Sequence, residues 1–210
     1  MSKICEELHR VFNSLPKQKF PFDEKKIPKN GIYILFEKGE KGHGFDRIVR
    51  IGTHTGDNNL RSRLKQHFLV KNKDRSIFRK NIGRVILNKN KDPYLEKWEL
   101  CLTSKEAREK YLHIVDLEKQ KQLEEEISSY IQKNFQFVVL PIENKDKRLG
   151  IESKIISAVS LCKECGPSNR WFGKFSPKDK IRESGLWLVN ELGKVALSEK
   201  ELEEVKRFIK

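Results

Sequence analysis

Two short apolar segments followed directly by a basic helix constrain this chain more than any other feature of its sequence. Residues 31–36 alternate, with three aliphatic or aromatic side chains on one face and Tyr33 on the other. This period of two predicts a β-strand with one face on the core and Tyr33 on the face away from it. Residues 47–52 form a second apolar segment after a glycine-rich stretch. Together the two segments predict a hairpin, with a loose loop over residues 39–44 and an exposed His43.

The segment that follows, residues 60–68, has the spacing of an amphipathic helix. Leu60, Leu64 and Phe68 form an i, i+4, i+8 stripe, and Arg63 and His67 stand beside it one turn apart. The polar turn before it offers two N-cap residues, Asp57 and Asn58. The pattern therefore predicts that a tyrosine, an arginine and a histidine meet at one place.

The rest of the chain predicts a mixed fold. Residues 3–15, 76–83 and 149–161 have helical periodicity, and we expect the basic residues of the second segment to face outward. Residues 103–133 are also helical, as one helix or two, and their glutamate run 124–126 is expected to be solvated. Residues 135–140 are typical of a strand that ends at a proline. A last helix begins at a Ser198 cap.

The charge of the chain indicates a polyanionic partner. The 210 residues carry a net charge of +14 with a pI near 9.6. Residues 61–97 hold twelve Lys and Arg against three acidic residues, a net charge of +9. No segment approaches the roughly 20 apolar residues of a membrane span, and we expect a cytoplasmic protein with reduced cysteines. Cys162 and Cys165 form one CxxC pair without a second, so buried or incidental thiols are favoured over a zinc or redox site.

Five landmarks occur in a fixed order along the chain, and they resemble the GIY-YIG nuclease superfamily. They are Gly-Ile-Tyr at 31–33, Arg-Ile-Gly at 50–52, Arg-Leu-x-x-His at 63–67, Glu152 in the first turn of an apolar helix, and Asn169. The resemblance covers roughly residues 28–175. It departs from the family pattern at Arg50, which stands where the second tyrosine is usual.

The resemblance implies an α/β (α+β) fold with a small, mostly antiparallel sheet flanked by helices. We expect an N-terminal helix and linker over residues 1–27 and a nuclease core over residues 28–175. A helical insertion at about 84–133 would interrupt that core, and residues 176–210 would pack on it as an extension.

The resemblance also implies metal-dependent DNA endonuclease chemistry. Glu152 would hold Mg²⁺ or Mn²⁺, because a hard ion takes oxygen ligands and one protein carboxylate suffices when phosphate supplies another oxygen. Arg63 would bind the scissile phosphate through its planar fork. Tyr33 would act as general base or position the attacking water, and Arg50 would contact phosphate.

Three further side chains complete the candidate site. His67 resembles the histidine of the family and would relay a proton or bind phosphate, and His54 is a second candidate for that role. Asn169 would orient the active-site groups.

The basic run predicts the surface that binds DNA, which we expect to be double-stranded. Its candidate phosphate contacts are Arg61, Lys65, Arg75, Arg79 and Lys80. A monomer with one site would nick DNA, whereas a homodimer would make a double-strand break.

Two other functions are compatible with parts of the sequence. Asp146 with Glu152-Ser153-Lys154 mimics the Asp and Glu-x-Lys pattern of another nuclease class, but the periodicity around Glu152 favours a helix over the strand which that class needs. The second alternative is a nucleic-acid-binding module that kept the fold and lost cleavage, with Arg50 as its sign.

Overall fold

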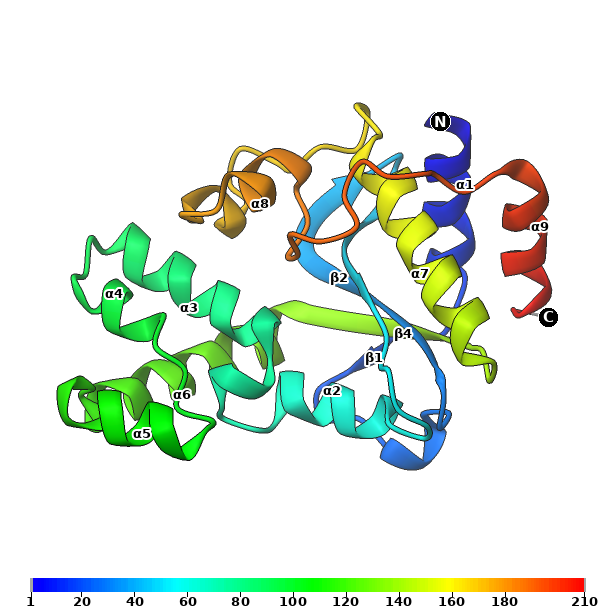
Figure 1. The fold of residues 1–210 in the computed structure, drawn as a ribbon. Coiled ribbons are helices and arrows are strands. Elements are labelled where there is room, and N and C mark those ends of the chain that lie inside the picture. Colours follow the sequence, from blue (N-terminus) through cyan, green and yellow to red (C-terminus); the bar gives the residue numbers. More distant parts are fainter. Residues whose placement is uncertain (1, 210) are drawn as a thin grey trace.

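The computed structural model describes residues 2–209 and contains a four-stranded antiparallel sheet (Figure 1). Its strands lie in the order β1-β4-β2-β3, and each neighbouring pair runs antiparallel. Their bounds are β1 (Gln18–Lys19), β2 (Gly31–Gly42), β3 (Phe45–Gly52) and β4 (Phe135–Pro141). The predicted fold class, a small antiparallel sheet flanked by helices, is confirmed.

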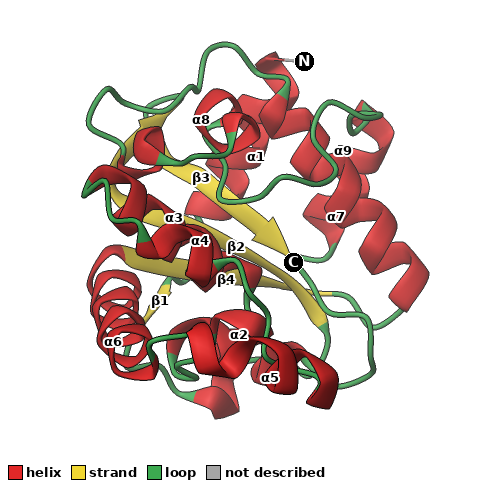
Figure 2. Ribbon diagram, turned by 60° about the vertical axis from the view of Figure 1, so that its left-hand side comes forward, coloured by secondary structure: helices red, strands yellow, loops and turns green. Residues whose placement is uncertain are grey.

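Helices cover both faces of this sheet (Figure 2). One layer holds α1 (Ser2–Asn13), α7 (Lys145–Ser160) and α9 (Glu199–Arg207). The other holds α2 (Leu60–Phe68), α3 (Ile77–Lys89), α4 (Tyr94–Trp98), α6 (Leu117–Asn134) and α8 (Asp179–Ser184). The remaining helix is α5 (Lys105–Tyr111), and short 3-10 turns lie at Glu24–Lys26, Lys73–Arg75, Leu112–Ile114 and Phe172–Phe175.

Tyr33 lies in the second of these layers. Ile32 and Ile34 face α1 and α7, whereas Tyr33 and Leu35 face the helices of the other layer. Tyr33 is 0% exposed. The expectation that Tyr33 points away from a core is therefore wrong, because the long segment between β3 and β4 folds over that face and builds a second core.

The β2–β3 hairpin is tighter than the sequence predicts. Only His43 and Gly44 lie between the two strands, and both have positive φ angles, 54° and 81°. Two such residues in succession form a two-residue hairpin turn. The loose loop and the exposed His43 are therefore not observed. The His43 side chain is 5% exposed, because the turn folds against α1 and the loop after α7.

Several helix boundaries also differ from the prediction. The cap of α7 is Asn144, whose side chain accepts the Lys147 N–H, so Glu152 lies beyond the first turn. The cap of α2 is Asn59, with no side-chain bond, in place of Asp57 or Asn58. Residues 103–133 form two α-helices, because Asp116 caps a new helix, α6, after a break.

Arg79 on α3 is buried and paired with Glu124 on α6. The guanidinium donates to Glu124 Oε2 through Nε at 2.9 Å and also donates to Ser128 Oγ at 2.8 Å. Arg79 is 0% exposed and Glu124 is 3% exposed. The expectations of an outward-facing Arg79 and a fully solvated 124–126 run are both wrong, because the two charges neutralise each other between the helices.

We predict that Glu124→Ala lowers the free energy of unfolding by about 3–5 kcal/mol, because it leaves the Arg79 charge buried without its partner. Denaturant unfolding measures this loss. Glu125→Ala is the matched control, since Glu125 is exposed and pairs with exposed Lys71, and it should change stability by less than about 1 kcal/mol. Equal effects of the two variants would contradict the prediction.

Candidate active site

Tyr33 and His67 meet in the layer between the sheet and α2. The Tyr33 hydroxyl lies 2.8 Å from His67 Nε2, and His67 Nδ1 lies 2.7 Å from Ser76 Oγ. Ser76 is the N-cap of α3, and its Oγ accepts the Arg79 N–H at 3.2 Å. A chain of hydrogen bonds thus joins β2, α2 and α3, and it brings together the predicted tyrosine and histidine.

His67 is held neutral. Its burial, followed by the positive charges of Arg63, Arg50 and Arg79, lowers its pKa well below the usual value. A neutral imidazole donates through one nitrogen and accepts through the other. Arg50 Nε donates to the Tyr33 oxygen at 3.4 Å. The consistent assignment has Tyr33 donating to Nε2 of His67, while Nδ1 of His67 donates to Ser76.

Gly52 provides the space for the Tyr33 hydroxyl. The two residues are paired across β2 and β3, and a Cβ at position 52 would lie 2.2 Å from the Tyr33 oxygen. Real Cβ contacts are never that short. A glycine is therefore needed at position 52, because any side chain there would occupy the space of the Tyr33 hydroxyl.

Arg50 is fixed between the second core and the surface. It donates to the Trp187 carbonyl, and its guanidinium lies 5.3 Å from the centroid of the Phe78 ring. Arg50 is 5% exposed, yet it lines a cleft of about 580 Å³. Arg50, the residue that departs from the family pattern, can therefore contact a molecule bound in this cleft.

That cleft also contains Glu152 and Arg63. β3 contributes Arg50, α2 contributes Arg63, α7 contributes Glu152, and the segment 188–191 also lines the cleft. The structure therefore brings three predicted site residues to one cleft. Tyr33 and His67 lie beneath it, linked to it through Arg50.

The Glu152 carboxyl has a raised pKa of about 7. Burial is the main cause, and the charge of Glu191 adds to it. The charge of Arg50, a hydrogen bond from the Thr53 backbone and the charge of Arg63 act in the opposite direction. The positive charge around Glu152 is thus too small to offset its burial.

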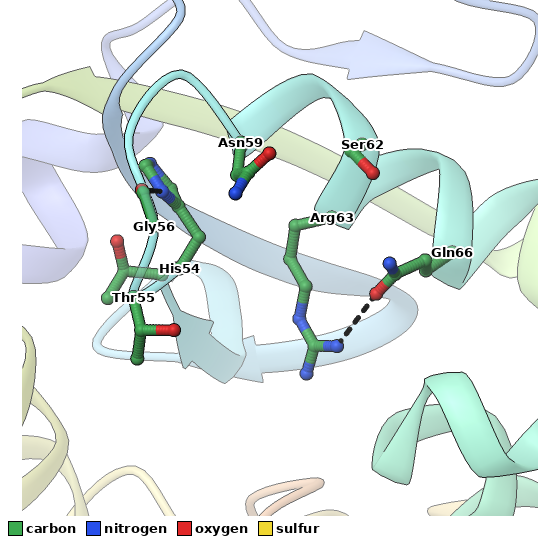
Figure 3. Close-up of a pocket in the computed structure, with 8 residues that line it drawn as sticks. His54, Thr55, Gly56, Asn59, Ser62, Arg63 and Gln66 are labelled. Carbon is green, nitrogen blue, oxygen red and sulfur yellow. Dashed lines mark hydrogen bonds between the residues drawn. The ribbon is translucent and has the colours of Figure 1, made fainter. Parts of the chain in front are cut away.

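A second cleft of about 430 Å³ adjoins the first, and both include Thr55 and Arg63 (Figure 3). His54 lines it and is 6% exposed. Its Nδ1 lies 2.5 Å from the Gly56 carbonyl, so Nδ1 is the donor, and Nε2 is buried without a partner among residues 2–209. Burial lowers the His54 pKa, so Nε2 is a free acceptor. In Figure 3, Arg63 extends from α2 and bonds to Gln66.

Arg50 and Arg63 differ from three buried arginines of the chain in having no acidic partner. Arg47, Arg79 and Arg84 each pair with a glutamate. By contrast, no carboxylate of residues 2–209 lies within ion-pair distance of Arg50 or Arg63, which bond instead to uncharged groups. Two uncompensated cations at a cleft are suited to bind an anion.

Asn169 is not brought to this site. It is exposed in the loop between α7 and the turn Phe172–Phe175, and it is absent from the linings of both clefts. Asn190 lines the Glu152 cleft instead. Sequence reasoning missed Asn190, because it follows an apolar segment, residues 186–189, that gives no signal beyond packing.

The predicted phosphate contacts lie in different environments. Arg75 is exposed, and Lys65 is half-exposed beside Glu24. Arg61 donates to the Ile27 carbonyl at 2.7 Å, and Lys80 donates to the Glu99 carbonyl at 2.7 Å. Arg79 is completely buried, so it cannot contact DNA, and its assignment is corrected.

Glu152 and two arginines without acidic partners thus line one cleft beside a small antiparallel sheet. Residues 5–210 match the GIY-YIG domain, and the chain therefore belongs to this family. Membership places it in a nuclease superfamily whose substrates are nucleic acids. No curated protein and no solved structure matches the chain. Among residues 2–209, no helix is both long and apolar enough to cross a bilayer.

We predict that Glu152→Gln stabilises the metal-free protein increasingly as the pH rises from 5 to 8. The folded state raises the Glu152 pKa from 4.5 to about 7, so it binds more protons than the unfolded state in that window, and wild-type stability falls with pH. The neutral variant avoids this loss, by about 1–2 kcal/mol at pH 8 after allowance for solvent screening.

Chemical unfolding in EDTA at several pH values measures the difference between the two proteins. Glu183→Gln changes an exposed glutamate and should give a difference that does not depend on pH. A difference for Glu152→Gln that stays constant from pH 5 to 8 would show that this carboxyl is not perturbed.

Proposed function

We propose that this chain is a metal-dependent endonuclease that hydrolyses phosphodiester bonds of double-stranded DNA at the Glu152 cleft. The observation that carries the proposal is the convergence of the Glu152 carboxylate and two arginines without acidic partners, from three separate elements. Arginines of this kind attract phosphate, and the Glu152 carboxylate beside them suits a hard cation.

The residues present fit such a cation. The raised pKa of Glu152 indicates a carboxylate with too little positive charge nearby, and a divalent ion beside it would favour the charged form. Ser153, Asn190 and Glu191 supply further side-chain oxygens in the same cleft. When bound, Mg²⁺ or Mn²⁺ would stabilise charge on the phosphoryl group and on the departing 3′ oxygen.

The two arginines have different roles. Arg63 is part-exposed and reaches both clefts, so it would hold the scissile phosphate by two parallel hydrogen bonds. Arg50 is fixed by Trp187 and Tyr33, so its charge is preorganised and would stabilise the additional negative charge of the transition state.

Tyr33 and His67 act beneath the cleft. Because the Tyr33 hydroxyl is enclosed and touches Arg50 and His67, we assign it to orienting Arg50, with neutral His67 as the acceptor of its proton. His54 lines a cleft together with Arg63, and its buried Nε2 is an acceptor without a partner among residues 2–209, so we assign it to proton acceptance and not to the binding of phosphate.

We predict that wild type cleaves plasmid DNA in Mg²⁺ or Mn²⁺ and that Glu152→Ala abolishes cleavage while DNA binding is retained. The variant removes the metal carboxylate and none of the phosphate-binding cations. Gel analysis of supercoiled plasmid over a series of salt concentrations measures cleavage, and mobility shift measures binding. Nicked product indicates one site acting alone, whereas linear product indicates two sites acting together, as in a homodimer.

The same assay tests the alternative, a binding module that has lost cleavage. The arginine at position 50 and the enclosed Tyr33 are the features that favour this alternative. If wild type and Glu152→Ala both shift DNA at low salt and neither cuts with either metal, the endonuclease proposal fails.

We also predict that Arg50→Gln lowers the cleavage rate at saturating DNA by about 10²-fold, because one preorganised charge is lost at the transition state. Arg75→Gln is the control. Arg75 is exposed and outside the cleft, so its change should weaken binding and leave the saturated rate unchanged. Circular dichroism checks that both variants fold. Undiminished cleavage by folded Arg50→Gln would remove Arg50 from the mechanism.

A further inference from the structure

A cluster of cysteine and histidine side chains lies where α1, the β2–β3 turn and the loop after α7 meet. Cys5 Sγ lies 3.4 Å from Cys165 Sγ, and Cys162 Sγ lies 3.3 Å from His43 Nε2. His9 is adjacent, with Nδ1 3.6 Å from Cys5 Sγ. Ligand atoms of Cys5, His9, His43 and Cys165 all lie within 4.8 Å of one another. The nuclease chemistry uses none of these residues.

We propose that Cys5, Cys162, Cys165 and His43 bind one structural zinc ion, which ties the N-terminal helix and the hairpin turn to the loop that follows α7.

The spacing of the ligand atoms suits zinc. Tetrahedral zinc takes sulfur at about 2.3 Å and histidine nitrogen at about 2.0–2.1 Å, so neighbouring ligand atoms lie roughly 3.5–3.8 Å apart. The observed separations of 3.4 and 3.3 Å are close to this edge length. Cys162 and Cys165 also have the C-x₂-C spacing that is typical of zinc sites.

His43 is the better nitrogen ligand of the two histidines. Nδ1 of His9 lies 2.9 Å from the Cys5 carbonyl, and Nε2 of His9 accepts the Ile48 N–H at 3.1 Å. Both nitrogens of His9 are therefore occupied. His43 instead directs Nε2 toward Cys162, while its Nδ1 lies 4.0 Å from a Glu164 carboxylate oxygen. This separation exceeds a hydrogen bond, but it leaves a carboxylate near the far nitrogen, which is the kind of partner that a histidine bound to zinc usually has.

The site is closed, as a structural zinc site should be. Cys5 is 0% exposed and Cys165 is 5% exposed, and four protein ligands leave no position open for substrate. Packing around it is tight, since a Cβ at Gly42 would lie 3.0 Å from Cys165 Cβ and 3.2 Å from His9 Nε2. Glu152 lies eight residues before the end of α7 at Ser160, roughly 12 Å of helix, and Cys162 lies beyond that end, so this ion would be separate from one bound at Glu152.

Metal analysis of the full chain, purified without chelator, tests the proposal. We expect one zinc per chain in wild type and in Cys101→Ser, because Cys101 is exposed and outside the cluster. Zinc should be lost in Cys5→Ser, Cys162→Ser, Cys165→Ser and His43→Asn. His9→Gln distinguishes the two ligand sets, since retention of zinc supports His43 with three cysteines. Loss in His9→Gln with retention in Cys162→Ser would overturn the proposed set.

Co²⁺ binding by wild type tests the site independently of the stability of any variant. Chelator-treated wild type should take up one Co²⁺ with the absorption bands of tetrahedral thiolate coordination, and added zinc should displace it. Alkylation followed by mass spectrometry should find Cys5, Cys162 and Cys165 protected only when metal is bound. The proposal is overturned if wild type binds neither ion or if a disulfide between Cys5 and Cys165 is found in their place.

Discussion

Burial of both faces of β2 is the constraint on which the rest of this structure depends. A sheet covered on both sides must provide a partner for every polar side chain that it carries. The Tyr33 hydroxyl is hydrogen-bonded to His67, and the Glu40 carboxylate accepts a hydrogen bond from Arg47 Nε at 3.0 Å. Glu37 accepts from the indole nitrogens of Trp171 and Trp187, each at 2.8 Å. The motif residues are therefore part of the buried hydrogen-bond network of the fold.

This network extends to the wall of the cleft. The Trp187 indole donates to Glu37. Its backbone N–H donates to the Val49 carbonyl at 2.7 Å, and its backbone carbonyl accepts from Arg50. The C-terminal segment is thus held beside β3, where residues 188–191 line the cleft that contains Glu152. Because Glu37, Val49 and Arg50 each hold Trp187 through one hydrogen bond, the geometry of the site depends in part on residues outside the family motifs.

Replacement of the second motif tyrosine by Arg50 changes the electrostatics of the site. The guanidinium is buried, has no acidic partner among residues 2–209, and contacts the first motif tyrosine. It lowers the pKa of His67 and opposes the rise in the pKa of Glu152. The cleft therefore has a fixed positive charge before any substrate binds, which supports phosphate recognition in the proposed mechanism.

Local pattern in the sequence determined the hairpin strands, α2 with its Arg63 and His67, the strand β4 and the Ser198 cap of α9, because each depends on periodicity or capping within a few residues. Tertiary structure alone decided that the face of β2 that carries Tyr33 is covered by helices, and which arginines are paired with a carboxylate. Arg79 and Arg50 have similar surroundings in the sequence, yet only Arg79 meets a carboxylate, since Glu124 comes from a helix 45 residues away. Asn190 and His43 gain their neighbours in the same way, from segments that sequence spacing does not connect.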